Sequence, residues 1–118
     1  MLYIGVDLGT SAVKLLMMDE NGNIQKIVSK EYPLYFPYPG WSEQNPQDWF
    51  AQSMEGIKEL TSECDKSQVA GISFGGQMHG LVVLDKEDQV IRPAILWNDG
   101  RTTKETNYLN QVIGKDKL

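Results

Sequence analysis

The chain has 118 residues, a length that fits one domain, and its formal net charge of -5 excludes recognition of nucleic acid or anionic membranes by charge alone. Its single cysteine, Cys64, excludes an internal disulfide and is typical of a reducing compartment. No apolar run approaches ~20 residues and no apolar leader opens the chain, so we expect a cytoplasmic protein that binds neither nucleic acid nor a membrane.

The opening of the chain predicts three antiparallel strands. Residues 2–8 are almost wholly apolar up to Asp7, which is typical of a central strand covered on both faces. Residues 12–18 repeat this character after the break at Gly9. Residues 24–32 then follow an Asn-Gly pair, the strongest short-range signal of a hairpin. We therefore expect a three-stranded antiparallel meander.

A loop and then a helix are expected after the meander. Residues 33–40 carry three prolines among aromatic side chains, a composition that sustains neither a ladder nor a helix. Asn45 offers an N-cap, Pro46 suits the first helical position, and Asp48 adds a negative charge to the first turn. Apolar side chains then recur every three or four residues and predict one buried face of a helix that ends near Ser62. They are Trp49, Phe50, Met54, Ile57 and Leu60.

The second half of the chain predicts short strands separated by polar turns. Residues 69–74 predict a buried strand, which the preceding helix allows to return parallel to the first strand. Residues 81–84 and 90–91 flank a charged turn and predict a hairpin, and residues 94–97 predict a short strand. From Arg101 the pattern becomes helical. No further strand follows, so we expect an incomplete α/β domain.

Asp7 and the turn that follows it predict a phosphate site. A carboxylate at the end of a buried strand is costly to desolvate unless it meets a cation, and Mg²⁺ held together with nucleotide phosphates supplies one. Gly9 lets the backbone turn closely, and Thr10 and Ser11 can then donate amide and hydroxyl hydrogens to phosphate oxygens. Lys14 can add a positive charge or face solvent. The alternative is an ordinary hairpin whose polar side chains satisfy the turn's own backbone groups.

Two later loops carry groups suited to a sugar. Gln77, Met78 and His79 lie between glycines after the strand 69–74, and loops at the ends of strands in α/β folds often bind ligands. Taken alone, His79 is more often a structural histidine than a site residue. A second loop offers an aromatic plate, a carboxylate and a guanidinium for stacking on and hydrogen-bonding a polyol. Its residues are Trp97, Asn98, Asp99 and Arg101. Its alternative role is a helix start capped by its carboxylate or its amide.

Four segments share one resemblance. They are residues 3–11, 41–44, 75–80 and 95–101, with the sequences YIGVDLGTS, WSEQ, GGQMHG and ILWNDGR. With these segments the chain resembles the FGGY carbohydrate kinases, and within them the xylulokinase branch, over nearly its whole length. Glycerol kinases typically carry an Arg-Glu pair in place of Met78 and His79. Gluconate kinases resemble the Gln-Met-His segment but usually lack the Asn-Asp-Gly-Arg segment, which makes them the closest competitors.

The resemblance implies both a fold and an activity. The fold is an α/β domain of the ribonuclease H-like type, as in the actin and hexokinase superfamily. The activity is the conversion of D-xylulose to D-xylulose 5-phosphate with ATP and Mg²⁺. Asp7 matches the residue that acts near the metal and the phosphates, and the turn 9–11 matches the phosphate turn. Met78 and His79 match the pair that binds the sugar.

In this resemblance residues 1–118 form the N-terminal portion of the family's N-terminal domain, and the C-terminal domain is absent. So is the aspartate that accepts the proton of the sugar hydroxyl, and we expect negligible kinase activity from these residues alone. The alternatives are a kinase for another sugar or sugar acid, such as gluconate, and a non-catalytic actin-like nucleotide-binding module. The sequence leaves the oligomeric state open, a homodimer included, because the loop 33–40 can serve either a domain contact or a subunit contact.

Overall fold

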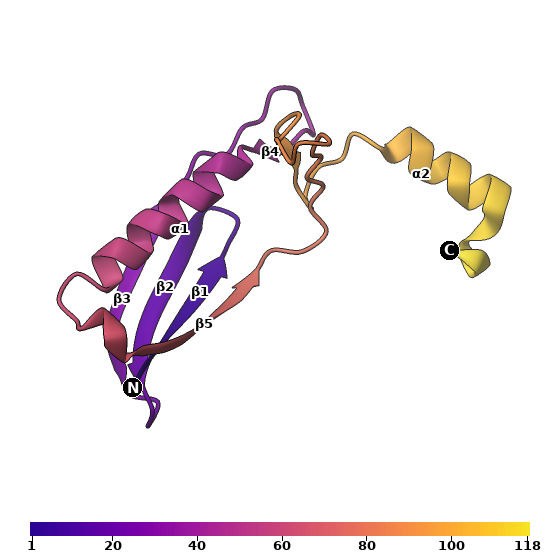
Figure 1. Cartoon of the computed structure of the whole chain (residues 1–118). Helices are drawn as coiled ribbons and strands as arrows, with labels where there is room; N and C mark the ends of the chain where they lie inside the picture. The colour runs from indigo at the N-terminus through magenta and orange to yellow at the C-terminus, as the bar shows by residue number, and fades with distance from the viewer.

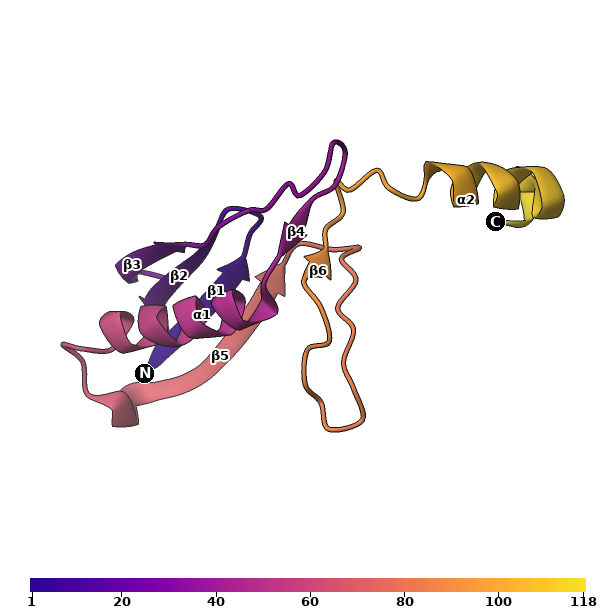
Figure 2. The same cartoon turned by 90° about the horizontal axis from the view of Figure 1, so that it is seen from above.

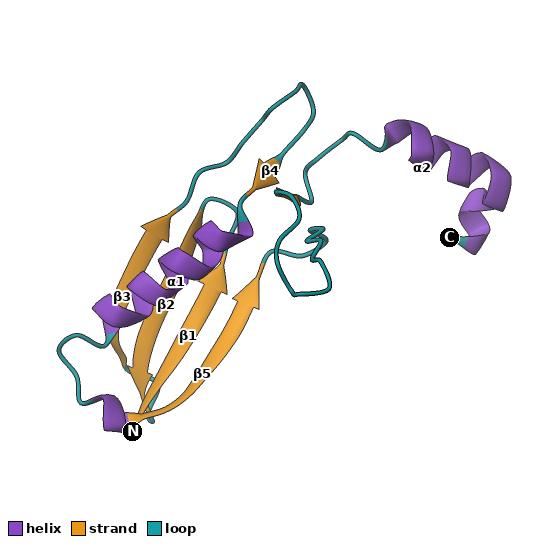
Figure 3. Ribbon diagram, turned by 45° about the horizontal axis from the view of Figure 1, so that its top comes forward, coloured by secondary structure: helices purple, strands orange, loops and turns teal.

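A four-stranded sheet forms the body of the molecule in the computed structural model, which describes all of residues 1–118. Its strands are β1 (Leu2–Leu8), β2 (Ala12–Asp19), β3 (Ile24–Glu31) and β5 (Val69–Gly76), in the order β3-β2-β1-β5 (Figure 3). The first three strands run antiparallel as a meander, and β5 runs parallel to β1. The predicted meander and the predicted parallel strand are both confirmed.

Helix α1 (Pro46–Leu60) covers one face of this sheet (Figure 1). Asn45 caps the helix as predicted, because its side chain accepts a hydrogen bond from Gln47 N at 3.1 Å. Gly56 lets the helix lie close to β2, since a Cβ at this position would collide with Leu15 Cδ1. The core lies between helix and sheet and consists of Ile4, Val6, Val13, Leu15, Met17, Val28, Tyr32 and Leu60.

The face of the sheet opposite α1 is open, so the prediction that β1 is covered on both faces is wrong for these residues. Side chains alternate across a strand. Ile4 and Val6 are buried against α1, whereas Asp7 lies on the other face and is exposed. Figure 2 shows no helix on that side of the sheet. Phe50 and Met54, which were predicted on the buried face of the helix, are exposed as well.

A second sheet of two short strands lies past the C-terminal ends of β1 and β5 (Figure 2). It pairs β4 (Glu43–Gln44) with β6 (Ala94–Ile95) in antiparallel register. β6 is shorter than the predicted strand 94–97. β4 was not predicted, because two residues carry no periodicity that indicates a strand. This small sheet ties the segment before α1 to the segment that follows β5.

The predicted hairpin between residues 81 and 91 is a loop without regular strands. Its two sides are joined by an isolated bridge between Leu84 and Val90, and Ile91 N donates to Val83 O at 3.0 Å. Its start is held by a further isolated bridge from Leu81 to β6. The chain reversal is therefore as predicted, but the strands are not.

The chain ends in helix α2 (Thr103–Leu109), which continues as a π-helical turn (Asn110–Gly114) and a 3₁₀ turn (Lys115–Lys117). The helix predicted from residue 101 is therefore confirmed. Figures 1 and 2 both show it standing away from the sheet, and none of its residues is buried. No helix in the chain has the length and apolar character that crossing a membrane requires.

Candidate functional site

The turn between β1 and β2 is closed by a contact that requires glycine. Gly9 N donates to the carbonyl oxygens of Asp7 and Ala12, at 3.2 and 3.0 Å. A Cβ on Gly9 would stand 2.8 Å from the Ala12 oxygen, closer than real Cβ atoms approach. The Tyr32 hydroxyl donates to Gly9 O. Burial, with a smaller contribution from the Asp7 carboxylate, raises the pKa of Tyr32 to about 12, so the hydroxyl keeps the proton that it donates. The hydroxyl of Ser11, by contrast, has no protein partner and is exposed.

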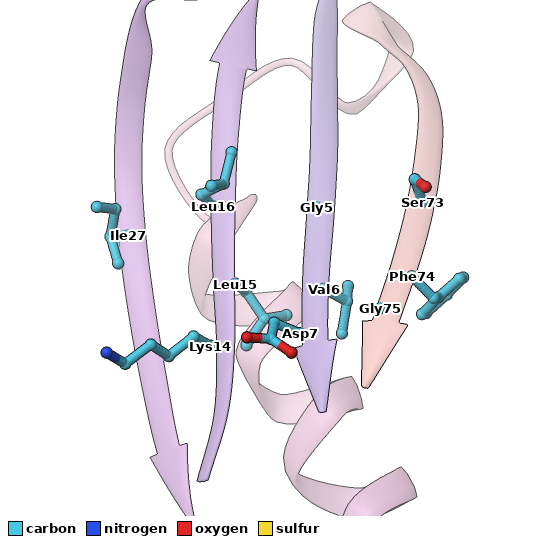
Figure 4. Close-up of a pocket in the computed structure, with 10 residues that line it drawn as sticks. All are labelled: Gly5, Val6, Asp7, Lys14, Leu15, Leu16, Ile27, Ser73, Phe74 and Gly75. Carbon is cyan, nitrogen blue, oxygen red and sulfur yellow. The ribbon is translucent and has the colours of Figure 1, made fainter. Parts of the chain in front are cut away.

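Asp7 and Lys14 are cross-strand neighbours on the open face of the sheet. They line a hollow of about 510 Å³ together with apolar side chains such as Leu16 and Ile27 (Figure 4). The Lys14 side chain extends toward β3, away from the Asp7 carboxylate, so the two charges do not pair (Figure 4). Asp7 is exposed, so the prediction that its carboxylate is buried and needs a cation for that reason is wrong. The open face leaves its carboxylate accessible to a ligand.

Asp7 can provide only part of the coordination shell of a metal ion. No group of three or more His, Cys, Asp or Glu side chains converges anywhere in the chain. Mg²⁺ keeps several waters and is commonly held by one or two carboxylates together with nucleotide phosphates. An exposed carboxylate at the end of β1, beside the turn 9–11, fits an ion shared with a nucleotide. Asp7 alone offers too few ligands to hold a metal ion without a nucleotide.

Three predicted site residues from separate segments meet at the Thr10 hydroxyl. Thr10 Oγ1 donates to Gln77 Oε1 at 3.4 Å, and Trp97 Nε1 donates to Thr10 Oγ1 at 3.2 Å. Gln77 N also donates to Leu8 O at 2.8 Å, which continues the ladder between β5 and β1. The turn 9–11 is thereby joined to both loops that were predicted to bind a sugar.

The direction of these bonds matters for phosphate binding. The Thr10 hydroxyl hydrogen is directed at Gln77, over a distance longer than the usual ~3.0 Å limit for a hydroxyl donor. It can meet a phosphate oxygen, as predicted, only by leaving this weak bond. The Ser11 hydroxyl needs no such exchange.

Gln44 lies at the centre of this region, and sequence reasoning missed it. Its side chain is 1% exposed. Its Nε2 donates to the carbonyl oxygen of Thr10, and its Oε1 accepts from Trp49 Nε1 at 2.9 Å and from Gln77 Nε2 at 3.1 Å. The only signal in the sequence was its place in the segment 41–44, which contributed to the family resemblance but received no role.

Met78 and His79 follow Gln77 and are both exposed. His79 has φ 62°, a left-handed conformation that costs a residue with a Cβ about 1–3 kcal/mol and that clusters at ligand-binding sites. Its side chain lines a hollow of about 220 Å³ whose other walls include Leu8, Trp49, Gln77 and Leu96. The predicted pair therefore lies beside the Thr10 junction, on a strained and accessible backbone.

Asp99 and Arg101 are engaged within the protein. Asp99 Oδ2 accepts from Ser42 N and from Arg101 Nη2, both at 2.7 Å, and Asp99 Oδ1 accepts from Arg101 Nε at 2.9 Å. The Asp99 side chain is 3% exposed. The hydrogen bonds from the Arg101 side chain, aided by backbone N–H groups, hold the pKa of Asp99 well below its ordinary value. Asp99 does not cap α2, so the alternative helix-cap role is not seen either.

Arg101 ties the same loop to the segment before α1. Its Nη2 donates to Glu43 Oε2 at 2.7 Å, and its guanidinium carbon lies 3.7 Å from the centre of the Trp41 ring. The hydrogen bonds to Asp99 raise the pKa of Arg101 further, with Glu43 contributing less. Arg92 also donates to Glu43. These contacts fix the loop that carries Trp97. From the sequence, this structural role of Asp99 and Arg101 could not be distinguished from direct sugar binding.

Comparison with known proteins gives consistent matches. The model for the N-terminal domain of the FGGY family of carbohydrate kinases matches residues 2–118. The xylulose kinase of Bacillus subtilis (strain 168) is 49% identical over 117 residues, which cover 98% of this chain and 23% of that protein. Gluconokinase from the same organism is 32% identical over 99 residues, or 84% of this chain and 19% of the relative.

Solved structures agree with these matches. The crystal structure of a xyloylose kinase from Brucella ovis superposes with a TM-score of 0.88 at 43% identity, over 94% of this chain and 24% of that chain. The predicted ribonuclease H-like fold of the actin and hexokinase superfamily is thereby confirmed. The chain spans less than a quarter of the length of the curated relatives named here.

Proposed function

The chain belongs to the FGGY family of carbohydrate kinases, and on that premise we propose that the complete protein transfers the terminal phosphoryl group of ATP to D-xylulose, giving D-xylulose 5-phosphate. The observation that carries the proposal is the junction at Thr10, where the turn suited to phosphate meets Gln77 and Trp97. Phosphoryl transfer asks a protein mainly to position two substrates and to stabilise charge. A direct link between the two sides of the site supports that task.

On the phosphate side, Gly9 lets the backbone pass close to a phosphate, and Ser11 offers a free hydroxyl. Asp7 would hold Mg²⁺ directly or through water, and Lys14 would add a positive charge beside the phosphates. The metal ion supplies neutralisation of the phosphate charge that increases during transfer. We assign Asp7 to activity because its exposed carboxylate ends β1 next to this turn.

On the sugar side, Met78 and His79 would contact the sugar, and Gln77 and Trp97 would orient it through an amide and an aromatic plate. Asp99 and Arg101 would act by holding the Trp97 loop, since their polar groups bind each other. The group that accepts the proton of the sugar hydroxyl is proposed to be an aspartate outside residues 1–118. The reaction also requires a partner domain that closes over both substrates.

A substrate panel on the complete protein tests the choice of sugar. ADP release would be measured with D-xylulose, gluconate and glycerol, and we expect kcat/KM to favour D-xylulose by at least ~10-fold, since a site built to bind particular hydroxyls discriminates by that much or more. A preference for gluconate would instead support the sugar-acid kinase that the 32% identity to gluconokinase allows. ATP binding without sugar-dependent turnover would favour the actin-like module.

A further inference from the structure

Gln44 is a buried polar side chain that the proposed function leaves without a task. Burying an amide is costly unless its donors and acceptors are paired. Gln44 meets this requirement through groups on three separate segments: the Thr10 carbonyl of the β1–β2 turn, the Trp49 indole of α1, and the Gln77 amide after β5. No other side chain makes hydrogen bonds to all three segments.

The indole of Trp49 fixes the direction of the bonds between the two amides and Thr10. An indole N–H can only donate, so Trp49 turns the Gln44 oxygen toward α1 and leaves the Gln44 amide hydrogens for the Thr10 carbonyl. The Gln77 amide nitrogen then donates to the same Gln44 oxygen, which leaves the Gln77 oxygen to accept from the Thr10 hydroxyl. The Trp97 indole, on the loop after β6, donates to the same Thr10 hydroxyl. A single arrangement of the two amides pairs all six groups: the two amides, the two indoles, and the carbonyl and the hydroxyl of Thr10.

We propose that Gln44 is a positioning residue that sets the turn 9–11 against the loop 75–80, and so sets the distance between phosphate and sugar. The proposal rests on the proposed function of these two segments. Gln44 itself is buried beneath both of them and touches neither substrate. Its hydrogen bonds to Thr10 and Gln77 hold the phosphate turn and the sugar loop in one relative position. A displacement of reacting groups by about 1 Å can lower the rate of an enzyme ~10²-fold.

The test compares Gln44→Met with Gln47→Met in the complete protein. Methionine keeps the length and much of the volume of glutamine but removes all three hydrogen bonds. Gln47 is exposed, and its side chain makes no hydrogen bond, so the same change there controls for the substitution itself. With the sugar that the wild type phosphorylates best, we expect Gln44→Met to lower kcat by ~10- to 100-fold, with smaller changes in the KM for ATP and for sugar. Gln47→Met should keep the wild-type kcat.

Amide hydrogen exchange gives a readout that does not depend on activity. In Gln44→Met, peptides that cover residues 8–12 and 75–80 should both exchange faster, because the two segments lose their common anchor. Wild-type exchange in both peptides, or a kcat within twofold of the control, would overturn the proposal. A lower melting temperature with an unchanged kcat would also overturn it, since that result indicates packing alone.

A second variant covers the case in which Gln44→Met does not fold. Trp49→Phe keeps a ring in place but removes the donor that orients the Gln44 oxygen, and it should lower kcat by a smaller factor while loosening the same two peptides. An unchanged kcat in Trp49→Phe would contradict the proposal. If the wild type prefers a sugar other than D-xylulose, the proposed substrate fails while the kcat comparison still decides the role of Gln44. If the wild type phosphorylates no sugar, amide hydrogen exchange in the peptides 8–12 and 75–80 alone decides the role of Gln44.

Discussion

Trp97 Nε1 donates a hydrogen bond to Thr10 Oγ1 at 3.2 Å, although 87 residues separate them in the chain. The bond connects the turn after β1 with the loop after β6. Gln77 reaches the same hydroxyl from the end of β5. Substitutions on one side of the proposed site should therefore affect the other side.

Trp97→Phe should weaken sugar use while keeping an aromatic plate. The variant loses one neutral hydrogen bond, worth about 1 kcal/mol, so kcat/KM for the sugar should fall roughly fivefold. Steady-state kinetics on the complete protein measure the change. Tyr108→Phe, on the exposed surface of α2, removes a polar group that has no partner and should leave kcat/KM at the wild-type value. An unchanged kcat/KM in Trp97→Phe would remove the indole N–H from the site.

His79→Gly should reduce sugar use without a large loss of stability. Glycine adopts φ 62° without strain, and the ~1 kcal/mol relieved is offset by the greater freedom of glycine in the unfolded chain. Asp88 has the same φ in an exposed loop, so Asp88→Gly is a matched control for the backbone. Both variants should melt within a few degrees of the wild type, and only His79→Gly should raise the KM for the sugar or lower kcat. Equal kinetics in the two variants would show that the imidazole has no role.

Gly9→Ala should abolish most of the activity. Its Cβ would stand 2.8 Å from the Ala12 oxygen, so the turn must open and carry Thr10 and Ser11 with it. A displacement of this kind lowers the rate by on the order of 10²-fold. In β5, Gly71→Ala places its Cβ at an ordinary 3.9 Å from the Tyr3 ring and should retain kcat. A Gly9→Ala protein with a kcat near that of Gly71→Ala would contradict the proposed phosphate turn.

Most of the fold could be predicted because the responsible signals are local. Apolar runs, the Asn-Gly turn and the cap at Asn45 each act within a few residues. The uncovered face of β1 could not be predicted. An apolar strand indicates that both of its faces can be buried, but it does not indicate which elements cover them. β4 was missed for a related reason, because its two residues form a strand only by pairing with β6.

Candidate site residues could be chosen from the sequence, but their contacts with one another could not. Gln77 and Trp97 were chosen for their chemistry, but only the folded chain brings both to Thr10. Asp99 and Arg101 were chosen as sugar-binding groups, and the sequence could not indicate that the carboxylate and the guanidinium bind each other and the segment before α1. Gln44 gave no signal of its own, because its function depends on three partners distant in the chain.

Asp99→Asn should destabilise the protein in a way that depends on pH. Removing one partner of a buried pair usually costs ~3–5 kcal/mol, and we expect about 2 kcal/mol here because Arg101 keeps Glu43. The pKa of Asp99 is lower in the folded than in the unfolded chain, so its stabilisation is complete above the unfolded pKa of about 4 and is lost progressively as the pH falls from there through the folded pKa. The difference in melting temperature between the wild type and the variant should be largest near neutral pH and should shrink steadily as the pH falls below about 4.

The exposed Asp116 provides the control for that prediction. Asp116→Asn should melt with the wild type at every pH, since its carboxylate makes no ion pair. A difference between wild type and Asp99→Asn that stays constant from pH 7 to pH 3 would mean that shape, and not the charge of Asp99, fixes the Trp97 loop.

The most direct test of the account is a ³¹P NMR record of the complete protein with ATP, Mg²⁺ and D-xylulose. We expect the γ-phosphate signal to be replaced by the signals of ADP and of a phosphomonoester on the terminal carbon of the sugar, at a rate that depends on D-xylulose. A signal of inorganic phosphate alone, or ATP that persists unchanged, would contradict the claim that Asp7, the turn 9–11 and the Gln77 and Trp97 loops belong to a D-xylulose kinase site.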